Sequence, residues 1–171
     1  MKSIRSFLDF TLTLQQSRVW KSSYEIRFGD ELLGSIHMPR LWSDRAEAES
    51  IDGRWSFERQ GILKSKIVAK VQDGTLAASY QPHSFKRSGS LIIGDEEPLS
   101  IKVGGFRNTL DVYSHFNEQV IHFQNHGVLR LRSEITLSYA AKHIPQFPLI
   151  FFMSCYILLC SRRDAERSVV I

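Results

Sequence analysis

Apolar and polar residues alternate along most of this chain, in short runs that end at turn-forming residues. Between Phe7 and Leu14 every second side chain is apolar. A period of two is typical of a strand with one buried face. Similar runs predict further strands at 24–28, 32–38, 46–51, 54–59, 62–71, 75–80, 90–94, 99–103, 109–113, 119–123 and 128–132, with 134–139 as one more candidate.

Turn chemistry separates these runs. Asp52-Gly53 lies between two alternating segments, which is the strongest short-range signal for a hairpin. Gln72-Asp73-Gly74 and the sequences GDEEP, SHFNE and QNHG occupy similar positions between later runs. We expect about eleven or twelve short strands at the spacing of an all-β barrel or sandwich.

One segment near the C-terminus breaks the pattern. From Leu149 to Cys160 there are 12 residues, all apolar or aromatic except Ser154, and Pro148 before them suits the first turn of a helix. A helix that is apolar on every side must be enclosed on every side. A closed barrel of short strands offers that enclosure and also removes exposed sheet edges. The expected fold is therefore mainly β, a closed barrel of about twelve strands around a hydrophobic C-terminal helix.

The domain organisation is simple. We expect one domain over 1–163 and a short polar tail over 164–171, without a secretory signal sequence. The alternative for the apolar segment is a tail anchor flanked by Arg162 and Arg163, but its length falls short of the ~20 residues that span a bilayer. Two free thiols in this segment, Cys155 and Cys160, suit a reducing compartment, so the expected location is cytoplasmic, with a peripheral position at a membrane left open.

The chain resembles the tubby C-terminal-like superfamily, which includes the tubby, phospholipid scramblase and LURP-one-related families. Three segments carry the resemblance: YEIRFGDELLGSI, GGFRNTLDVYSHFNEQVIHF and PLIFFMSCYILL. It covers most of Ser23 to Arg163 and implies a twelve-stranded barrel around a hydrophobic helix. It implies little chemistry: tubby binds phosphoinositides, scramblase members act at membranes, and most small bacterial members have no assigned activity. No phosphoinositide-contacting residue of tubby is carried over to a position here.

Basic residues give the strongest candidate binding site. Lys64, Lys66 and Lys70 share one face of a predicted strand, and Arg130 and Arg132 share one face of another. If the two strands lie close together, these five cations form a patch for a phosphorylated headgroup or an anionic membrane. The competing interpretation is that outward strand faces are normally charged, and that lysines protect sheet edges from aggregation. The excess of 22 Lys and Arg over 18 Asp and Glu permits an anionic partner without requiring one.

No group of residues specifies a reaction or a cofactor. His122 and His126 are four residues apart, but they fall at a strand end and turn, where that spacing does not make histidines converge on a metal. The sequence RSGSL lacks the frame of a nucleophile elbow. We therefore predict no catalytic residue, no metal and no cofactor. Nucleic acid is not an expected partner, because cations and aromatic residues occupy opposite strand faces.

These observations lead to one main functional hypothesis. We expect a non-enzymatic binding or scaffold module that recognises anionic lipid headgroups, or a protein partner, through its basic strand faces. Two alternatives stay open. One is an enzyme of unrecognised type with a cleft at the barrel mouth, and the other is a tail-anchored membrane protein.

Overall fold

The computed structural model describes residues 1–17, 22–39, 44–61, 65–83, 87–105, 108–126 and 131–169. The strands are β1 (Thr11–Gln16), β2 (Ser23–Phe28), β3 (Glu31–His37), β4 (Arg45–Ser50), β5 (Gly53–Gln60), β6 (Lys66–Val71), β7 (Leu76–Pro82), β8 (Ser88–Ile92), β9 (Leu99–Val103), β10 (Thr109–Tyr113), β11 (Gln119–His126) and β12 (Arg132–Leu137). The helical elements are the 3₁₀ helices η1 (Ile4–Phe7) and η3 (Tyr139–His143) and the α-helix α1 (Phe147–Val169).

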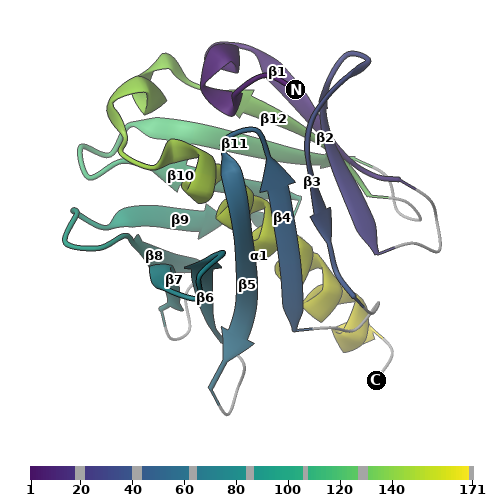
Figure 1. The fold of residues 1–171 in the computed structure, drawn as a ribbon. Helices are drawn as coiled ribbons and strands as arrows, with labels where there is room; N and C mark the ends of the chain where they lie inside the picture. The colour runs from purple at the N-terminus through teal and green to yellow at the C-terminus, as the bar shows by residue number, and fades with distance from the viewer. Residues whose placement is uncertain are drawn as a thin grey trace.

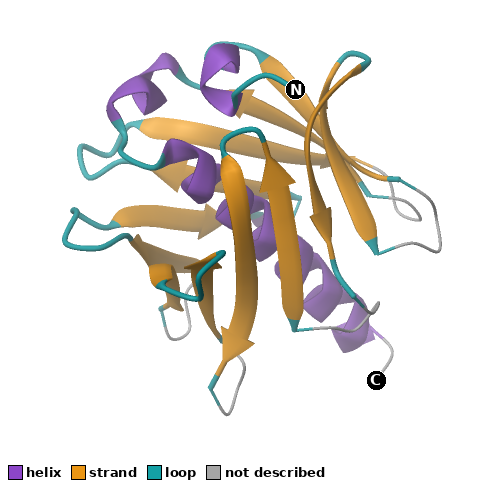
Figure 2. Cartoon of the chain, in the orientation of Figure 1, coloured by secondary structure: helices purple, strands orange, loops and turns teal. Residues whose placement is uncertain are grey.

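The twelve strands form one closed antiparallel barrel (Figure 1). Each strand pairs with its neighbours in sequence, and β1 pairs with β12 to close the sheet. Figure 2 shows α1 as the long helix that runs through the barrel, while η1 and η3 lie at the end where α1 begins. The fold class expected from the sequence is confirmed.

Alternation of side chains sets which face of each strand points inward. In β4 every second residue is buried, from Ala46 through Ala48 to Ser50. Ser50 pairs with Gly53 of β5, so the expected hairpin forms with a tight turn between the strands. Asp52 in this turn accepts a hydrogen bond from the backbone amide of Ile4 at 3.0 Å, which ties the N-terminal segment to the barrel.

Every residue of α1 from Phe147 to Cys160 is buried. Phe152 packs against Trp55 of β5 with ring centroids 5.3 Å apart, and Tyr156 stacks on Phe57 at 5.4 Å. Ser154, the one polar residue in the apolar run, donates a hydrogen bond to the carbonyl oxygen of Ile150 at 2.8 Å. Its hydroxyl is therefore satisfied within the helix, which removes the cost of burying it.

Several element bounds differ from the sequence prediction. The first strand begins at Thr11, not Phe7, because Asp9 has a positive φ of 66° and ends the alternation, which leaves Phe10 49% exposed. The run at 62–71 is a strand from Lys66 onward, and 62–64 lie outside the described residues.

Two further bounds differ near the C-terminus. The runs at 128–132 and 134–139 meet in one strand, β12 (Arg132–Leu137), and 128–130 lie outside the described residues. It runs through buried Ser133, whose hydroxyl donates a hydrogen bond to the carbonyl oxygen of Gln124 at 3.3 Å. The predicted tail also differs: α1 continues through residue 164 to Val169.

Among the residues that the structure describes, no helix combines the length and the apolar content that crossing a bilayer requires.

Both native thiols should be unreactive in the folded protein. Cys155 is 0% and Cys160 4% exposed. Burial raises both pKa values, that of Cys160 to about 11 even with the cations Arg163 and Arg59 nearby, so the reactive thiolate is scarce at neutral pH. We expect an aromatic disulfide reagent to label neither thiol in native protein and both in guanidinium, with the exposed variant Thr136→Cys labelling at once as a positive control. Rapid labelling of either native cysteine would exclude an enclosed helix.

Candidate binding site at one end of the barrel

The structure describes three of the five cations that the sequence singles out. Lys64 and Arg130 lie outside the described residues. Lys66 and Lys70 lie on β6, and Arg132 is the first residue of β12. Because β6 and β12 are six strands apart in either direction around the barrel, they stand on opposite walls. The two basic strand faces do not come together, and one headgroup cannot contact both.

Strand direction nevertheless places two of these cations at the same end. β6 and β12 both start at the end of the barrel where α1 finishes, so their first residues, Lys66 and Arg132, lie at that end. Arg87, directly before β8, lies there as well. All three are exposed, and none has an ion-pair partner among the described residues. We call Lys66, Arg87 and Arg132 the basic rim.

Lys70 does not belong to the basic rim. It is four residues further along β6, about 13 Å from Lys66 at the usual rise per strand residue. Its ammonium group lies 3.9 Å from a carboxylate oxygen of Glu58, and its side chain is 39% exposed. Lys70 therefore contributes to the side wall of the barrel and not to its end.

Three other cations at this end are paired with acids, while Lys102 of β9, which pairs with Ser88, lies over the ring of Tyr113. Three ion pairs fix the last turns of α1: Arg59–Asp164, Arg162–Glu166 and Arg163–Asp44. Arg59 donates two hydrogen bonds to the carboxylate of Asp164, at 2.9 and 3.0 Å. These contacts explain why the helix continues past the predicted start of the tail. They also neutralise acids that would otherwise oppose the charge of the basic rim.

The strands at this end are joined by segments that lie outside the described residues. Their sequences contain no Asp or Glu and seven cations: Arg18, Lys21, Arg40, Lys64, Lys86, Arg107 and Arg130. The same segments contain large apolar residues, including Trp20, Trp42, Leu63, Phe85, Phe106 and Leu129. The sequence of the connections therefore has the same sign of charge as the basic rim.

The opposite end of the barrel, where α1 begins, carries the other sign of charge. We call it the acidic end. Its turns and the adjoining N-terminal residues contain the acids Asp9, Asp30, Glu31, Asp52, Asp73, Asp95, Glu96, Glu97 and Glu118. Lys2, Arg5 and Lys142 also lie at this end, and Arg27 reaches it by donating a hydrogen bond to the carbonyl oxygen of Asp30 at 2.7 Å. The large apolar residues exposed in the described part of the chain also lie at this end: Met1, Phe10, Phe28, Leu32, Ile51, Leu76, Ile92, Phe116 and Tyr139.

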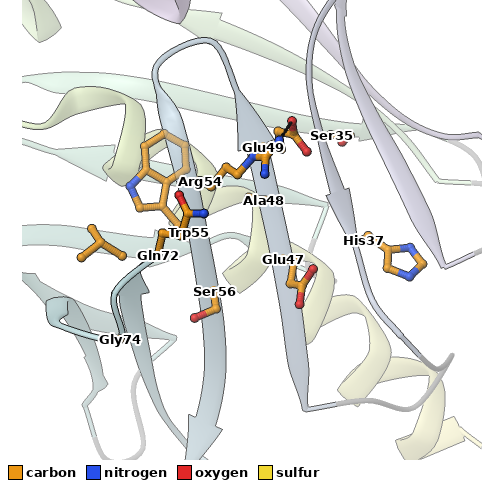
Figure 3. A pocket seen from close by; sticks show the side chains of 11 residues that line it. Ser35, His37, Glu47, Ala48, Glu49, Arg54, Trp55, Ser56, Gln72 and Gly74 are labelled. Carbon is orange, nitrogen blue, oxygen red and sulfur yellow. Dashed lines mark hydrogen bonds and ion pairs between the residues drawn. The ribbon is translucent and has the colours of Figure 1, made fainter.

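A cavity of about 460 Å³ on the side of the barrel does not suit an anion (Figure 3). It is lined by residues of β3, β4, β5, the end of β6 and the β6–β7 turn, with Glu47 and Glu49 on β4. Arg54 forms an ion pair with Glu49, with a guanidinium nitrogen 2.7 Å from the carboxylate oxygen. His37 is hydrogen-bonded through Nδ1 to the hydroxyl of Ser23 at 2.9 Å. The carboxylates outnumber the one guanidinium, so a phosphate would be repelled here.

The histidines occupy scattered positions. His122 lies 2.5 Å from Asp111 through Nδ1, and His126 is 3.6 Å from Glu134. No group of three potential metal ligands is present in the described part of the chain. His83 contacts the hydroxyl of Ser90 at 2.9 Å, but no carboxylate of the described residues orients its ring, so this pair lacks the third member of a hydrolytic triad.

These features define a closed twelve-stranded antiparallel barrel around a C-terminal helix, with cations at one end and acids at the other. An X-ray structure of a protein from Arabidopsis thaliana, AT5G01750, has a similar fold, with a TM-score of 0.57. The match covers 94% of this chain and 96% of that chain at 10% sequence identity, which shows the fold alone. No family model matches this chain, and no curated protein does.

Proposed function

We propose that this protein is a non-enzymatic binding module that attaches to anionic membrane surfaces through the basic rim. The observation that carries the proposal is the gathering of Lys66, Arg87 and Arg132 at one end, exposed and without ion-pair partners among the described residues. A flat anionic surface can contact cations from opposite walls of a barrel at the same time, whereas a single headgroup cannot. Each cation near such a surface contributes about 1 kcal/mol.

The charge at the other end supports a single orientation on the membrane. An anionic bilayer repels the acidic end and attracts the basic rim, so the two ends act together to orient the barrel axis towards the surface. The proposed location is the cytoplasmic face of a membrane, because two buried free thiols suit a reducing compartment.

We also propose that the chain belongs to the tubby C-terminal-like superfamily, with the LURP-one-related and phospholipid scramblase-like proteins. The closed barrel around one apolar helix supports this assignment, since it is the architecture that the sequence resemblance implies. The Arabidopsis protein supports the fold and adds no function.

Sedimentation with vesicles tests the function. The protein should co-sediment with phosphatidylcholine vesicles that contain phosphatidylserine, and not with phosphatidylcholine alone. Binding should fall as salt rises, because surface charges are screened within about 10 Å at 0.1 M salt. The triple variant Lys66→Gln, Arg87→Gln, Arg132→Gln should bind roughly 100-fold more weakly at low salt, since it loses three contributions of about 1 kcal/mol.

A second triple variant serves as the matched control. Lys2→Gln, Lys70→Gln and Lys142→Gln remove the same net charge from residues outside the basic rim, and binding should change little. Equal losses for the two triple variants would show that net charge alone attracts the protein, and the rim proposal would then be wrong. Equal binding to both kinds of vesicle would also contradict it.

A further inference from the structure

A second cavity, of about 420 Å³, lies at the acidic end of the barrel. It lies between the β8–β9 turn, the β10–β11 turn and the segment that leads from η3 into α1. Its apolar lining includes the buried residues Ile93 and Leu99 and the segment Ile144-Pro145 just before the helix. This volume lies within the range of small-molecule sites.

Aromatic rings stand beside this apolar lining. Phe116 is 74% and Tyr139 53% exposed, and both line the cavity. The ring of His115 packs against that of Phe116, with centroids 3.8 Å apart. Tyr139 is held through its hydroxyl, which accepts a hydrogen bond from the ammonium group of Lys142 at 2.7 Å. Exposed aromatic faces attract cations through the negative potential above the ring, and the ammonium group of Lys142 already lies over that of Tyr139, 5.1 Å from its centroid.

Three carboxylates give the cavity a negative charge. Glu96 and Glu97 come from the β8–β9 turn, and Glu118 from the β10–β11 turn. None of the three forms an ion pair among the described residues, and no described Lys or Arg lines the cavity. The acids therefore approach one apolar space from two separate loops. The basic side chains that share its lining are those of His115 and His143.

We infer that this cavity binds a small organic cation, an ammonium group carried on an apolar or aromatic body. The apolar lining and Phe116 accommodate the body, and the three carboxylates neutralise the charge. A carboxylate or phosphate ligand of the same shape would be repelled, and a neutral ligand would gain only the apolar contact. The inference is independent of membrane binding, because the cavity and the basic rim lie at opposite ends of the barrel.

Three probes that share a ring and a linker test this inference on the full chain. Phenethylammonium, 2-phenylethanol and 3-phenylpropanoate differ mainly in charge, and each is titrated into isotope-labelled protein while backbone amide signals are followed by NMR. Phenethylammonium should give saturable shifts at residues 114–118 and 139–144. We expect it to bind at least about threefold more tightly than the neutral probe, from exposed charge pairs that contribute up to ~1 kcal/mol each. The anionic probe should bind most weakly.

Variants separate the charge contribution from the apolar one. The triple variant Glu96→Gln, Glu97→Gln, Glu118→Gln should weaken phenethylammonium binding about fivefold or more and leave 2-phenylethanol unchanged. The triple variant Asp30→Asn, Glu31→Gln, Asp73→Asn is the matched control, because it removes the same charge at the same end from residues that do not line the cavity. Phe116→Ala should weaken both probes alike. Absence of saturable binding, equal affinity for the three probes, or a cation affinity that the triple variant does not change would overturn the inference.

Discussion

A chain truncated after Lys142 should not form the native barrel. The truncation removes α1, whose residues from Phe147 to Cys160 are all buried among inward-facing strand side chains. Replacing a single buried aromatic residue such as Phe152 by alanine typically costs about 3–5 kcal/mol. A domain has only about 5–15 kcal/mol of stability, so loss of the whole helix exceeds what the fold can tolerate.

The measurements are near-UV circular dichroism, dye binding to exposed apolar surface, and sedimentation. We expect no fixed aromatic signal, strong dye binding and aggregation, the properties of a chain that has lost specific packing. The control is a chain that ends at Glu166, which keeps the Arg59–Asp164 and Arg162–Glu166 pairs and should stay folded. A truncated chain that remains monomeric with native-like stability would show that the barrel does not need α1 in its core.

The fold could be predicted because its two main determinants are local in the sequence. Alternation with period two marks strands wherever one face is buried, and an apolar run such as Leu149–Cys160 can only lie inside. Strand bounds were predicted wrongly where a single residue departs from the alternating pattern. The positive φ of Asp9 delays the first strand, and the hydrogen bond of Ser133 lets a polar residue face inward in β12.

The candidate site could be predicted only in part, because it depends on which strands are neighbours. Lys66 and Arg132 were identified as exposed cations on strand faces, but nothing local to either segment reveals that six strands separate them. What unites them is position along the barrel axis. Counting alternate strand directions from the N-terminus could have found this, since in an up-and-down barrel every even-numbered strand starts at the same end. The same counting separates the acidic turns from the basic connections.

Gly34 of β3 marks the closest approach between the barrel wall and α1. A Cβ atom added there would lie 2.6 Å from Cζ of Phe152 and 2.8 Å from the carbonyl oxygen of Glu49. Both distances are shorter than side-chain contacts allow, and the second obstacle is backbone in the paired strand β4. Because Phe152 is itself fixed against Trp55 and Phe151, its ring has little room to withdraw.

Gly34→Ala should therefore destabilise the protein by about 3 kcal/mol, at the upper end of the usual cost of overpacking a core. For a chain of this size the melting temperature should fall by about 6–12 °C, measured by thermal unfolding. Gly105→Ala is the matched control, because a Cβ there meets nothing within 4 Å. In a Phe152→Leu background, Gly34→Ala should lower the melting temperature by less than it does in the native protein. It should still lower it, since the Glu49 carbonyl obstructs the added methyl group. A melting temperature for Gly34→Ala as high as that of Gly105→Ala would mean that helix and wall are not packed as closely as these contacts require.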